Sequence, residues 1–229
     1  MESGALYLPK ATRLSREFFG MSLLEASSAD NTVTFLEDLV GKLTEGLGKV
    51  SVYPMISMSN HHPEFLGWPI ENLKSFLISS YASRARDPFE DAQVCLAREY
   101  GYQNWQEVKE SPVQFTASFE QALKALLNGE LQNLEALLRV ETSLTQAISP
   151  FAHRATLLHY AASNGVEIWR QQVPNNLSEG VGLLLRYGAN PKSVMKVYGG
   201  EFDVIALLDS SAHPKDAGCY EAVRAELPK

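Results

Sequence analysis

Residues 155–165, "ATLLHYAASNG", and residues 183–191, "LLLRYGANP", decide the fold that the sequence predicts. In the first stretch Thr156 suits a helix start, and Gly165 suits a helix end because glycine readily adopts the left-handed backbone found there. In the second stretch three leucines precede Gly188, which suits the end of another helix. Two short helices joined in this way cannot bury their apolar sides alone, so the pair needs similar neighbours.

Similar pairs occur on both sides of this one. Gly129 and Gly165 each close a first helix, 36 residues apart. Residues 203–227 contain the apolar pattern of a further pair. Repetition at a period in the thirties is typical of stacked helical repeats. We therefore predict an all-α fold with about three repeats, at about 118–150, 151–191 and 192–227.

The central pair resembles an ankyrin repeat. The residues that match the first-helix signature of that family are Thr156, Leu158, His159, Ala161, Ala162 and Gly165. Residues 183–190 match the end of the second helix. Leu157 stands where the family usually has proline, and the insertion at 166–178 is similar to one carried by a bacterial variety of ankyrin protein. The resemblance implies a short ankyrin-like helical repeat solenoid.

Residues 91–105, "DAQVCLAREYGYQNW", resemble the leader that precedes the first repeat in those proteins. We therefore expect three regions, which are an irregular helical N-terminal region of unknown type at 1–84, a helical leader or cap at 85–112, and ankyrin-like repeats at 113–229. Within the first region, residues 49–60 alternate in the manner of a strand but contain Pro54, which cannot donate to a sheet. We predict a loop or a short extended piece there.

Four residues of the central pair are predicted to be framework, namely Thr156, His159, Gly165 and Gly188. The resemblance implies that His159 bonds the loop between neighbouring repeats, and the Thr156 hydroxyl is a suitable partner at a helix start. A catalytic histidine needs a nucleophile or an acid held by a third group, and the sequence contains no such set. His61 and His62 are adjacent and do not face one way, so we predict no metal site.

The repeat register predicts two rows of side chains on the concave face, which the resemblance implies is a partner-binding surface. This prediction takes Gly129, Gly165 and Ala212 as equivalent helix ends. The first row is then Lys124, Tyr160 and Leu207, and the second row is Asn128, Asn164 and Ser211. The first row combines a cationic, an aromatic and an aliphatic side chain, and the second row consists of small polar side chains. This combination suits a protein partner better than a phosphate.

Two loops carry the remaining candidate partner-binding residues. His153 and Arg154 precede the central pair, at the place where a hairpin tip would project toward a partner. The insertion contains a tryptophan and an arginine, which are residue types enriched at interface anchors. The residues expected to line one shallow pocket there are Trp169, Arg170, Asn175 and His213. The competing interpretation is that Trp169 covers the top of the repeat stack.

The composition favours a soluble protein of the cytoplasm. Of 229 residues 45% are hydrophobic and 21% are charged, which is ordinary for a globular protein. The net charge is −7 and no dense run of Lys or Arg occurs, so we expect neither a nucleic-acid partner nor a membrane partner. Cys95 and Cys219 give no disulfide framework. We find neither a signal peptide nor a stretch of roughly eighteen apolar residues that would span a membrane.

Enzyme motifs are absent from the sequence, which contains no GxSxG, Walker loop, GxGxxG after a strand or HExxH. We therefore predict a non-catalytic protein-interaction module, an adaptor or regulator, with no cofactor and an unidentified protein partner. Two alternatives stay open. Residues 1–80 would be an effector or enzyme-derived part targeted by the repeats, or the pocket of the 166–178 insertion would sense a small molecule. A homodimer also stays open, because Val223 and Leu227 of the last repeat need cover.

Overall fold

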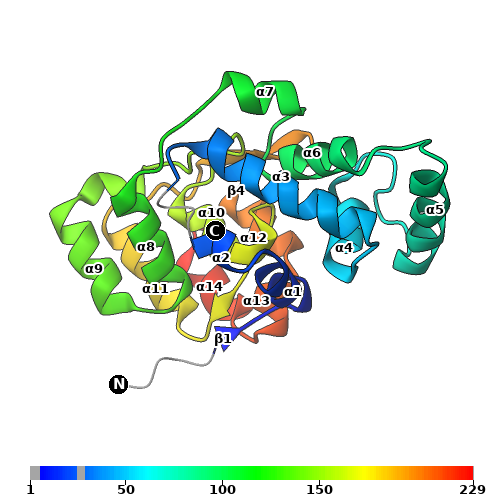
Figure 1. Cartoon of the computed structure of the whole chain (residues 1–229). Coiled ribbons are helices and arrows are strands. Elements are labelled where there is room, and N and C mark those ends of the chain that lie inside the picture. The colour runs from blue at the N-terminus through cyan, green and yellow to red at the C-terminus, as the bar shows by residue number, and fades with distance from the viewer. Residues whose placement is uncertain (1–5, 25–28, 229) are drawn as a thin grey trace. The chain divides into compact units, whose positions relative to one another are not determined.

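The computed structural model describes residues 6–24 and 29–228 (Figure 1). Most of these residues are helical, as the periodicity predicts, and the described strands are short. The chain forms two compact units. Unit 1 contains Met1–Thr12 and Thr116–Lys229, and unit 2 contains Arg13–Phe115. Unit 1 is thus built from two chain segments that unit 2 separates in the sequence.

Unit 2 is a set of helices around an apolar core. The helices are α1 (Lys10–Phe19), which begins in the first segment of unit 1, α2 (Met21–Leu24), α3 (Thr32–Gly48), α4 (Val52–His61), α5 (Ile70–Ala82), α6 (Pro88–Glu99) and α7 (Trp105–Glu110). α3 packs against α4 and α6, and α4 packs against α5 and α6. Leu36, Leu39 and Leu43 of α3 are fully buried, at the three- and four-residue steps of one helix face.

The expectation of a loop or an extended piece at residues 49–60 was wrong, because α4 fills most of this segment. Ser51 precedes the helix, so Pro54 lies in its first turn. The first N–H groups of a helix have no acceptor within it, and a proline there therefore removes no hydrogen bond. Tyr53 and Met55, on either side of the proline, are buried in the core.

Unit 1 contains three stacked helix pairs (Figure 1). The pairs are α8 (Ala117–Leu127) with α9 (Leu131–Val140), α10 (Leu157–Ala162) with α11 (Leu177–Arg186), and α12 (Val204–Ser210) with α14 (Tyr220–Glu226). Short elements between them are η1 (Thr142–Thr145), η2 (Ile168–Arg170) and α13 (His213–Asp216). α10 contacts both α8 and α12, and α11 contacts both α9 and α14. The first helices and the second helices therefore form two layers around one core.

Left-handed glycines follow the caps of α8 and α11, as the sequence predicts. α10 ends at Ala162 with Ser163 as its left-handed cap, so the prediction that Gly165 closes this helix was wrong. Gly129 has φ +71°, Gly165 has φ +72° and Gly188 has φ +91°. Gly165 also lies where a side chain has little room, because a Cβ atom there would be 3.0 Å from the side chain of Val197. Ala212 has φ −77°, in the helical region. Ala212 lies two residues after the end of α12, as Gly129 does after α8, so the two positions match along the helix but differ in backbone conformation.

Two hairpin loops lie side by side in unit 1. The first, residues 148–156, is closed by an antiparallel bridge between Ile148 and Thr156. The second consists of β3 (Val194–Val197) and β4 (Gly200–Asp203), which pair in antiparallel register. The Lys196 N–H donates a hydrogen bond of 2.9 Å to the carbonyl oxygen of His153 and so joins the two loops.

The N-terminal arm, which we define as residues 6–12, belongs to unit 1. Its strand β1 (Leu6–Tyr7) pairs in antiparallel register with β2 (Val173–Pro174) of the insertion. Leu6 lies opposite Pro174, and Tyr7 lies opposite Val173. The insertion is therefore paired with a segment that lies far from it in the sequence.

Candidate functional site

His159 is part of the framework of unit 1. Its Nδ1 accepts the Thr156 N–H at 3.0 Å, and its Nε2 lies 3.0 Å from the carbonyl oxygen of Ser193, in the loop before the next helix pair. These partners assign the ring hydrogen to Nε2 in a neutral imidazole. Burial lowers the pKa of His159 to about 4, despite the bond to Ser193. The predicted bonds to Thr156 and to the inter-repeat loop are both present.

The first predicted row of partner-binding residues is not a surface. Tyr160 is 0% exposed and Leu207 is 1% exposed, so the expectation that they face a partner was wrong, whereas Lys124 is exposed. Tyr160 is buried because the insertion covers α10. The Tyr160 hydroxyl donates to Glu167 at 3.0 Å, and Arg170 lies over the Tyr160 ring at 5.7 Å.

The second row is engaged within the chain. Asn128 accepts a hydrogen bond from Gln172 at 2.8 Å. Asn164 donates to Ser210 at 2.8 Å and accepts from the hydroxyl of Tyr198 at 2.7 Å. Ser211 was wrongly expected at the surface, since it is buried and donates to the carbonyl oxygen of Ser163 at 3.2 Å. These residues join neighbouring helix pairs.

The two residues of the predicted hairpin tip, His153 and Arg154, differ in their exposure to solvent. His153 lies in the turn, as predicted, but the expectation that it faces a partner was wrong, because it is fully buried and its Nδ1 accepts the Ala155 N–H at 3.1 Å. Arg154 is exposed, as predicted, and has a φ of +56°. An alternation of buried and exposed residues in a short hairpin accounts for the difference.

The insertion does not bring its four predicted pocket residues together. Arg170 turns into the interior and is 4% exposed, so its predicted place in a shallow pocket was wrong. Its guanidinium lies 4.3 Å from the ring of Trp169, which is half-buried, whereas Asn175 is exposed. His213 lies 3.2 Å from the side-chain oxygen of Gln171, and its ring is 6.4 Å from the ring of Tyr7.

A buried ionic cluster holds the insertion against the helices, and we call it the Glu167 cluster. It consists of Glu120 of α8, His153, Tyr160 of α10, Glu167 and Arg170. Arg170 binds the carboxylate of Glu120 and lies 3.4 Å from Glu167. His153 Nε2 lies 3.5 Å from the same Glu167 oxygen that accepts the Tyr160 hydroxyl.

The two carboxylates of the Glu167 cluster differ in their ease of ionisation. Burial raises the pKa of Glu120, even though Arg170 opposes this effect. Burial also acts on Glu167, but Arg170 and His153 hold its pKa below the ordinary value. The sequence interpretation overlooked both residues. The spacing of Glu167 and Arg170, three residues apart in a segment with apolar neighbours, was the available signal.

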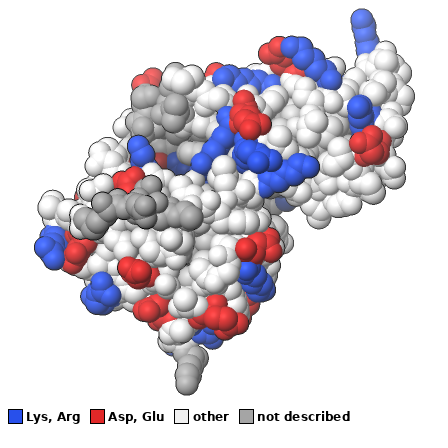
Figure 2. Space-filling model, turned by 90° about the horizontal axis from the view of Figure 1, so that it is seen from below, with Lys and Arg blue, Asp and Glu red and all other residues white. Residues whose placement is uncertain are grey.

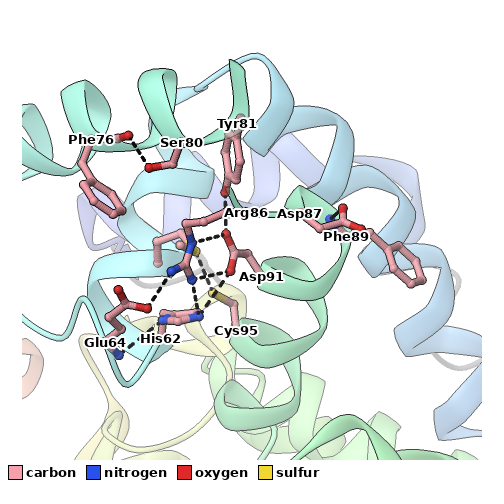
Figure 3. Close-up of polar contacts among 11 residues, drawn as sticks. His62, Glu64, Phe76, Ser80, Tyr81, Arg86, Asp87, Phe89, Asp91 and Cys95 are labelled. Atoms are coloured by element: carbon pink, nitrogen blue, oxygen red, sulfur yellow. Dashed lines mark hydrogen bonds and ion pairs between the residues drawn. The ribbon is translucent and has the colours of Figure 1, made fainter. Parts of the chain in front are cut away.

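A second ionic cluster lies in unit 2, and Figure 3 shows how its side chains converge. We call it the Asp91 cluster, and it consists of His62, Glu64, Tyr81, Arg86 and Asp91. Asp91 accepts hydrogen bonds from Tyr81 at 2.9 Å and from Arg86 at 2.6 and 3.1 Å. Arg86 also donates to Glu64 at 2.6 Å.

The Asp91 cluster ties the end of α4, the end of α5 and the start of α6 together. Burial alone would raise the pKa of Asp91, but hydrogen bonds from His62, Arg86 and Tyr81 lower it to about 2. The guanidinium of Arg86 lies 4.6 Å over the ring of Phe65. The sequence placed Asp91 in a leader helix, and nothing in its spacing pointed to Arg86 or Tyr81 as partners.

The nearby thiol is not arranged as a nucleophile. Cys95 is buried, its Sγ lies 3.3 Å from the Sδ of Met58 (Figure 3), and burial raises its pKa well above the ordinary value. Among residues 6–24 and 29–228, no group of three His, Cys, Asp or Glu side chains has the arrangement that a metal ion needs. No helix in the described part of the chain is long and apolar enough to cross a membrane.

Three of the exposed large apolar side chains of unit 1 lie on the two hairpin loops, and the others among the described residues are Leu6, Leu8 and Val140. Ile148, Val194 and Tyr198 are exposed, and Tyr198 reaches 69%. Tyr198 has a φ of +54° and precedes Gly199 at +76°. Figure 2 shows Lys and Arg side chains beside Asp and Glu side chains at several places on the face drawn, with uncharged residues over most of it.

Comparisons with known proteins give no relative. No known protein family, curated protein or solved structure matches the chain.

Proposed function

We propose that unit 1 is an ankyrin-like repeat unit that binds a protein partner without catalysis, through its two adjacent hairpin loops. The observation that carries the proposal is a pair of large side chains, Arg154 and Tyr198, that are exposed at φ +56° and +54°. Both loops belong to one surface, because the Lys196 N–H binds the carbonyl oxygen of His153.

The left-handed backbone disfavours both residues. A side chain other than glycine loses about 1–2 kcal/mol in this conformation, and asparagine or glycine would fit better. Strain of this kind is found at binding and catalytic sites more often than elsewhere. Tyr198 donates to Asn164 within the chain at 2.7 Å but stays 69% exposed, and Arg154 is also exposed. Contacts with a partner would offset the strain of both residues.

The chemistry of the surface also suits a protein partner. Tyr and Arg are the residue types that dominate the binding energy of protein interfaces. Ile148 and Val194 add exposed apolar area on the same loops. The insertion covers α10 and buries Tyr160, so the face of the central pair that the repeat register predicts as a binding surface is closed.

The test compares three forms of the immobilised full chain. These are the wild type, an Arg154→Gly/Tyr198→Asn double variant, and an Arg139→Gln/Arg186→Gln control variant whose changes lie on the second helices. An extract of the cells that make the protein is passed over each. We expect a protein that the wild type and the control retain and that the double variant retains at least tenfold less.

Circular dichroism must first find all three forms equally folded. If the double variant retains every protein that the wild type retains, the hairpin loops are not the binding surface and the proposal fails.

A further inference from the structure

The N-terminal arm binds a surface of unit 1 that we call the seat. The seat consists of β2, the carbonyl groups of Ile168 and Gln171, and the side chains of His213 and Asp216. Strand β1 pairs with β2 of the insertion. The Thr12 hydroxyl lies 2.9 Å from the carbonyl oxygen of Ile168 and 3.1 Å from that of Gln171. The Tyr7 hydroxyl donates to Asp216 at 3.0 Å, and its ring lies beside His213. The seat therefore binds an extended segment that carries a tyrosine.

In the sequence, unit 2 lies between the arm and the rest of unit 1. The chain leaves unit 1 after Thr12, forms the whole of unit 2, and returns at Thr116. The arm and unit 2 are therefore one continuous piece, and only one connection joins that piece to the rest of unit 1.

The connection, residues 111–116, is suited to act as a hinge. Residues 111–116 lie in no helix or strand, and all of them except Phe115 are exposed. Val113 is fixed to unit 2, since its N–H donates to the Thr32 hydroxyl at 3.1 Å and its carbonyl accepts the Thr32 N–H at 2.9 Å. Phe115 also packs against Phe35 of unit 2, with ring centroids 5.7 Å apart. Rotation at Thr116 would therefore release the arm from its seat and leave the other contacts within each unit intact.

We infer that the seat on unit 1 can bind the N-terminal arm of a second copy, which gives an arm-exchanged homodimer. Every contact of the arm with its seat is the same whether the arm comes from its own chain or from another. Exchange of an identical element is a known low-energy route to a dimer. Two arms and two seats satisfy one another, so the assembly closes at two copies.

The balance between monomer and dimer depends on concentration and on the hinge. A tethered arm meets its own seat at an effective concentration of about millimolar when the linker spans the gap without strain. A short hinge lowers this value, and a longer flexible hinge restores it. The dimer share should therefore rise with chain concentration and fall when the hinge is lengthened.

Cysteine pairs test the inference directly. Leu6 and Pro174 lie opposite each other on antiparallel strands, at a separation that a disulfide can bridge. We would mix a Leu6→Cys chain with a Pro174→Cys chain at several hundred micromolar, incubate, oxidise, and run a non-reducing gel. Only an arm that docks on another copy can join the two chains, so a band of twice the chain mass is the expected result.

Three controls accompany the mixture. Wild type, with its buried Cys95 and Cys219, must stay uncross-linked. A Leu8→Cys chain mixed with Pro174→Cys should cross-link at least fivefold less, because Leu8 lies outside the ladder. The Leu6→Cys/Pro174→Cys double variant at low concentration should close within one chain. If it closes but the mixture gives no dimer band, the arm stays in its own chain and the inference is overturned.

A second experiment needs no cysteine at the ladder. Light scattering on the wild type is compared with a variant that carries Gly-Gly-Ser after Phe115. We expect a dimer fraction that grows with concentration in the wild type and is several-fold smaller in the variant. Wild type that remains monomeric at several hundred micromolar, or a variant with an unchanged dimer share, overturns the inference. Neither result bears on the hairpin surface, because the arm is not part of it.

Discussion

The Asp91 cluster and the Glu167 cluster contain the same kinds of side chain, yet they are satisfied to different degrees. Each has an arginine between two carboxylates, with a tyrosine and a histidine beside them. In the Asp91 cluster both oxygens of Asp91 accept hydrogen bonds. In the Glu167 cluster, Oε2 of Glu167 and Oε1 of Glu120 accept none from the described residues.

The two clusters differ in hydrogen bonding because they differ in how far their side chains are buried. Glu64 of the Asp91 cluster has a half-exposed side chain, so water completes its hydrogen bonds. The side chains of Glu167 and Arg170 are almost wholly removed from water. A buried ion pair gains little net stability because desolvation opposes it, but breaking it leaves an uncompensated charge. The Glu167 cluster therefore fixes where the insertion packs more than it stabilises unit 1.

The largest effect is expected from Arg170→Met, which leaves two buried carboxylates without their cation. Unit 1 should lose about 3–5 kcal/mol of unfolding free energy. Urea unfolding followed by the fluorescence of Trp169, the tryptophan of unit 1, measures the loss. Arg139→Met is the matched control, since Arg139 pairs with Glu135 at the surface and its side chain is 68% exposed. It should change stability by less than about 1 kcal/mol, and equal losses in the two variants would refute the contrast.

The next effect is the pH dependence of unit 1. His159 has a pKa of about 4 in the folded state and 6.5 when unfolded, so the unfolded chain binds more protons between these values. Stability is therefore lost as pH falls from 6.5, and the loss from this residue reaches about 3 kcal/mol at pH 4. Urea unfolding at pH 7 and 4 should find a smaller pH-dependent loss in His159→Gln than in wild type. A ring that titrates near 6.5 in NMR spectra would contradict the prediction.

The Asp91 cluster should respond at lower pH. The folded pKa of Asp91 is about 2 and its ordinary value is 3.8, so its contribution is present above pH 4 and is lost as pH falls through 2. The loss amounts to about 2 kcal/mol. Fluorescence of Trp68 and Trp105, the tryptophans of unit 2, follows the unfolding. Asp91→Asn should be less stable than wild type at pH 7 and should lack this further loss, and a parallel decline in both proteins would count against the assignment.

The smallest effect concerns the strained loop. Arg154→Gly should raise the unfolding free energy of unit 1 by about 1 kcal/mol, because glycine adopts a φ of +56° without the steric penalty that arginine has. Arg139→Gly changes the same residue type within a helix and should lower it. Thermal unfolding of both variants measures the signs. A loss of stability in Arg154→Gly would remove the strain argument for the hairpin surface.

Local chemistry explains what the sequence predicts correctly. Gly129 and Gly188 end their helices for a reason that lies in each residue and its neighbours. The bonds of His159 to Thr156 and Ser193 follow from a short motif and the loop that adjoins it. These features need little knowledge of the distant chain.

The errors come from distant segments. Tyr160 lies on a helix face that the repeat register leaves open, and the insertion closes it by bringing Glu167 and Arg170 against it. No periodicity within α10 carries that information. The partners of Asp91 come from residues 62–86 of the same unit, and their convergence depends on how three helices pack. Pro54 was misinterpreted because its effect depends on where its helix begins.

The route of the chain through unit 1 also bears on how the protein is made. Tyr7 and its partner Asp216 are separated by 209 residues. At translation rates of about 5–20 residues per second, Tyr7 is synthesised about 10–40 s before Asp216. Unit 2 can fold during that interval, because all of its residues precede Thr116. Strand β1 stays unpaired until β2 is synthesised, so the arm is open to other partners during that interval.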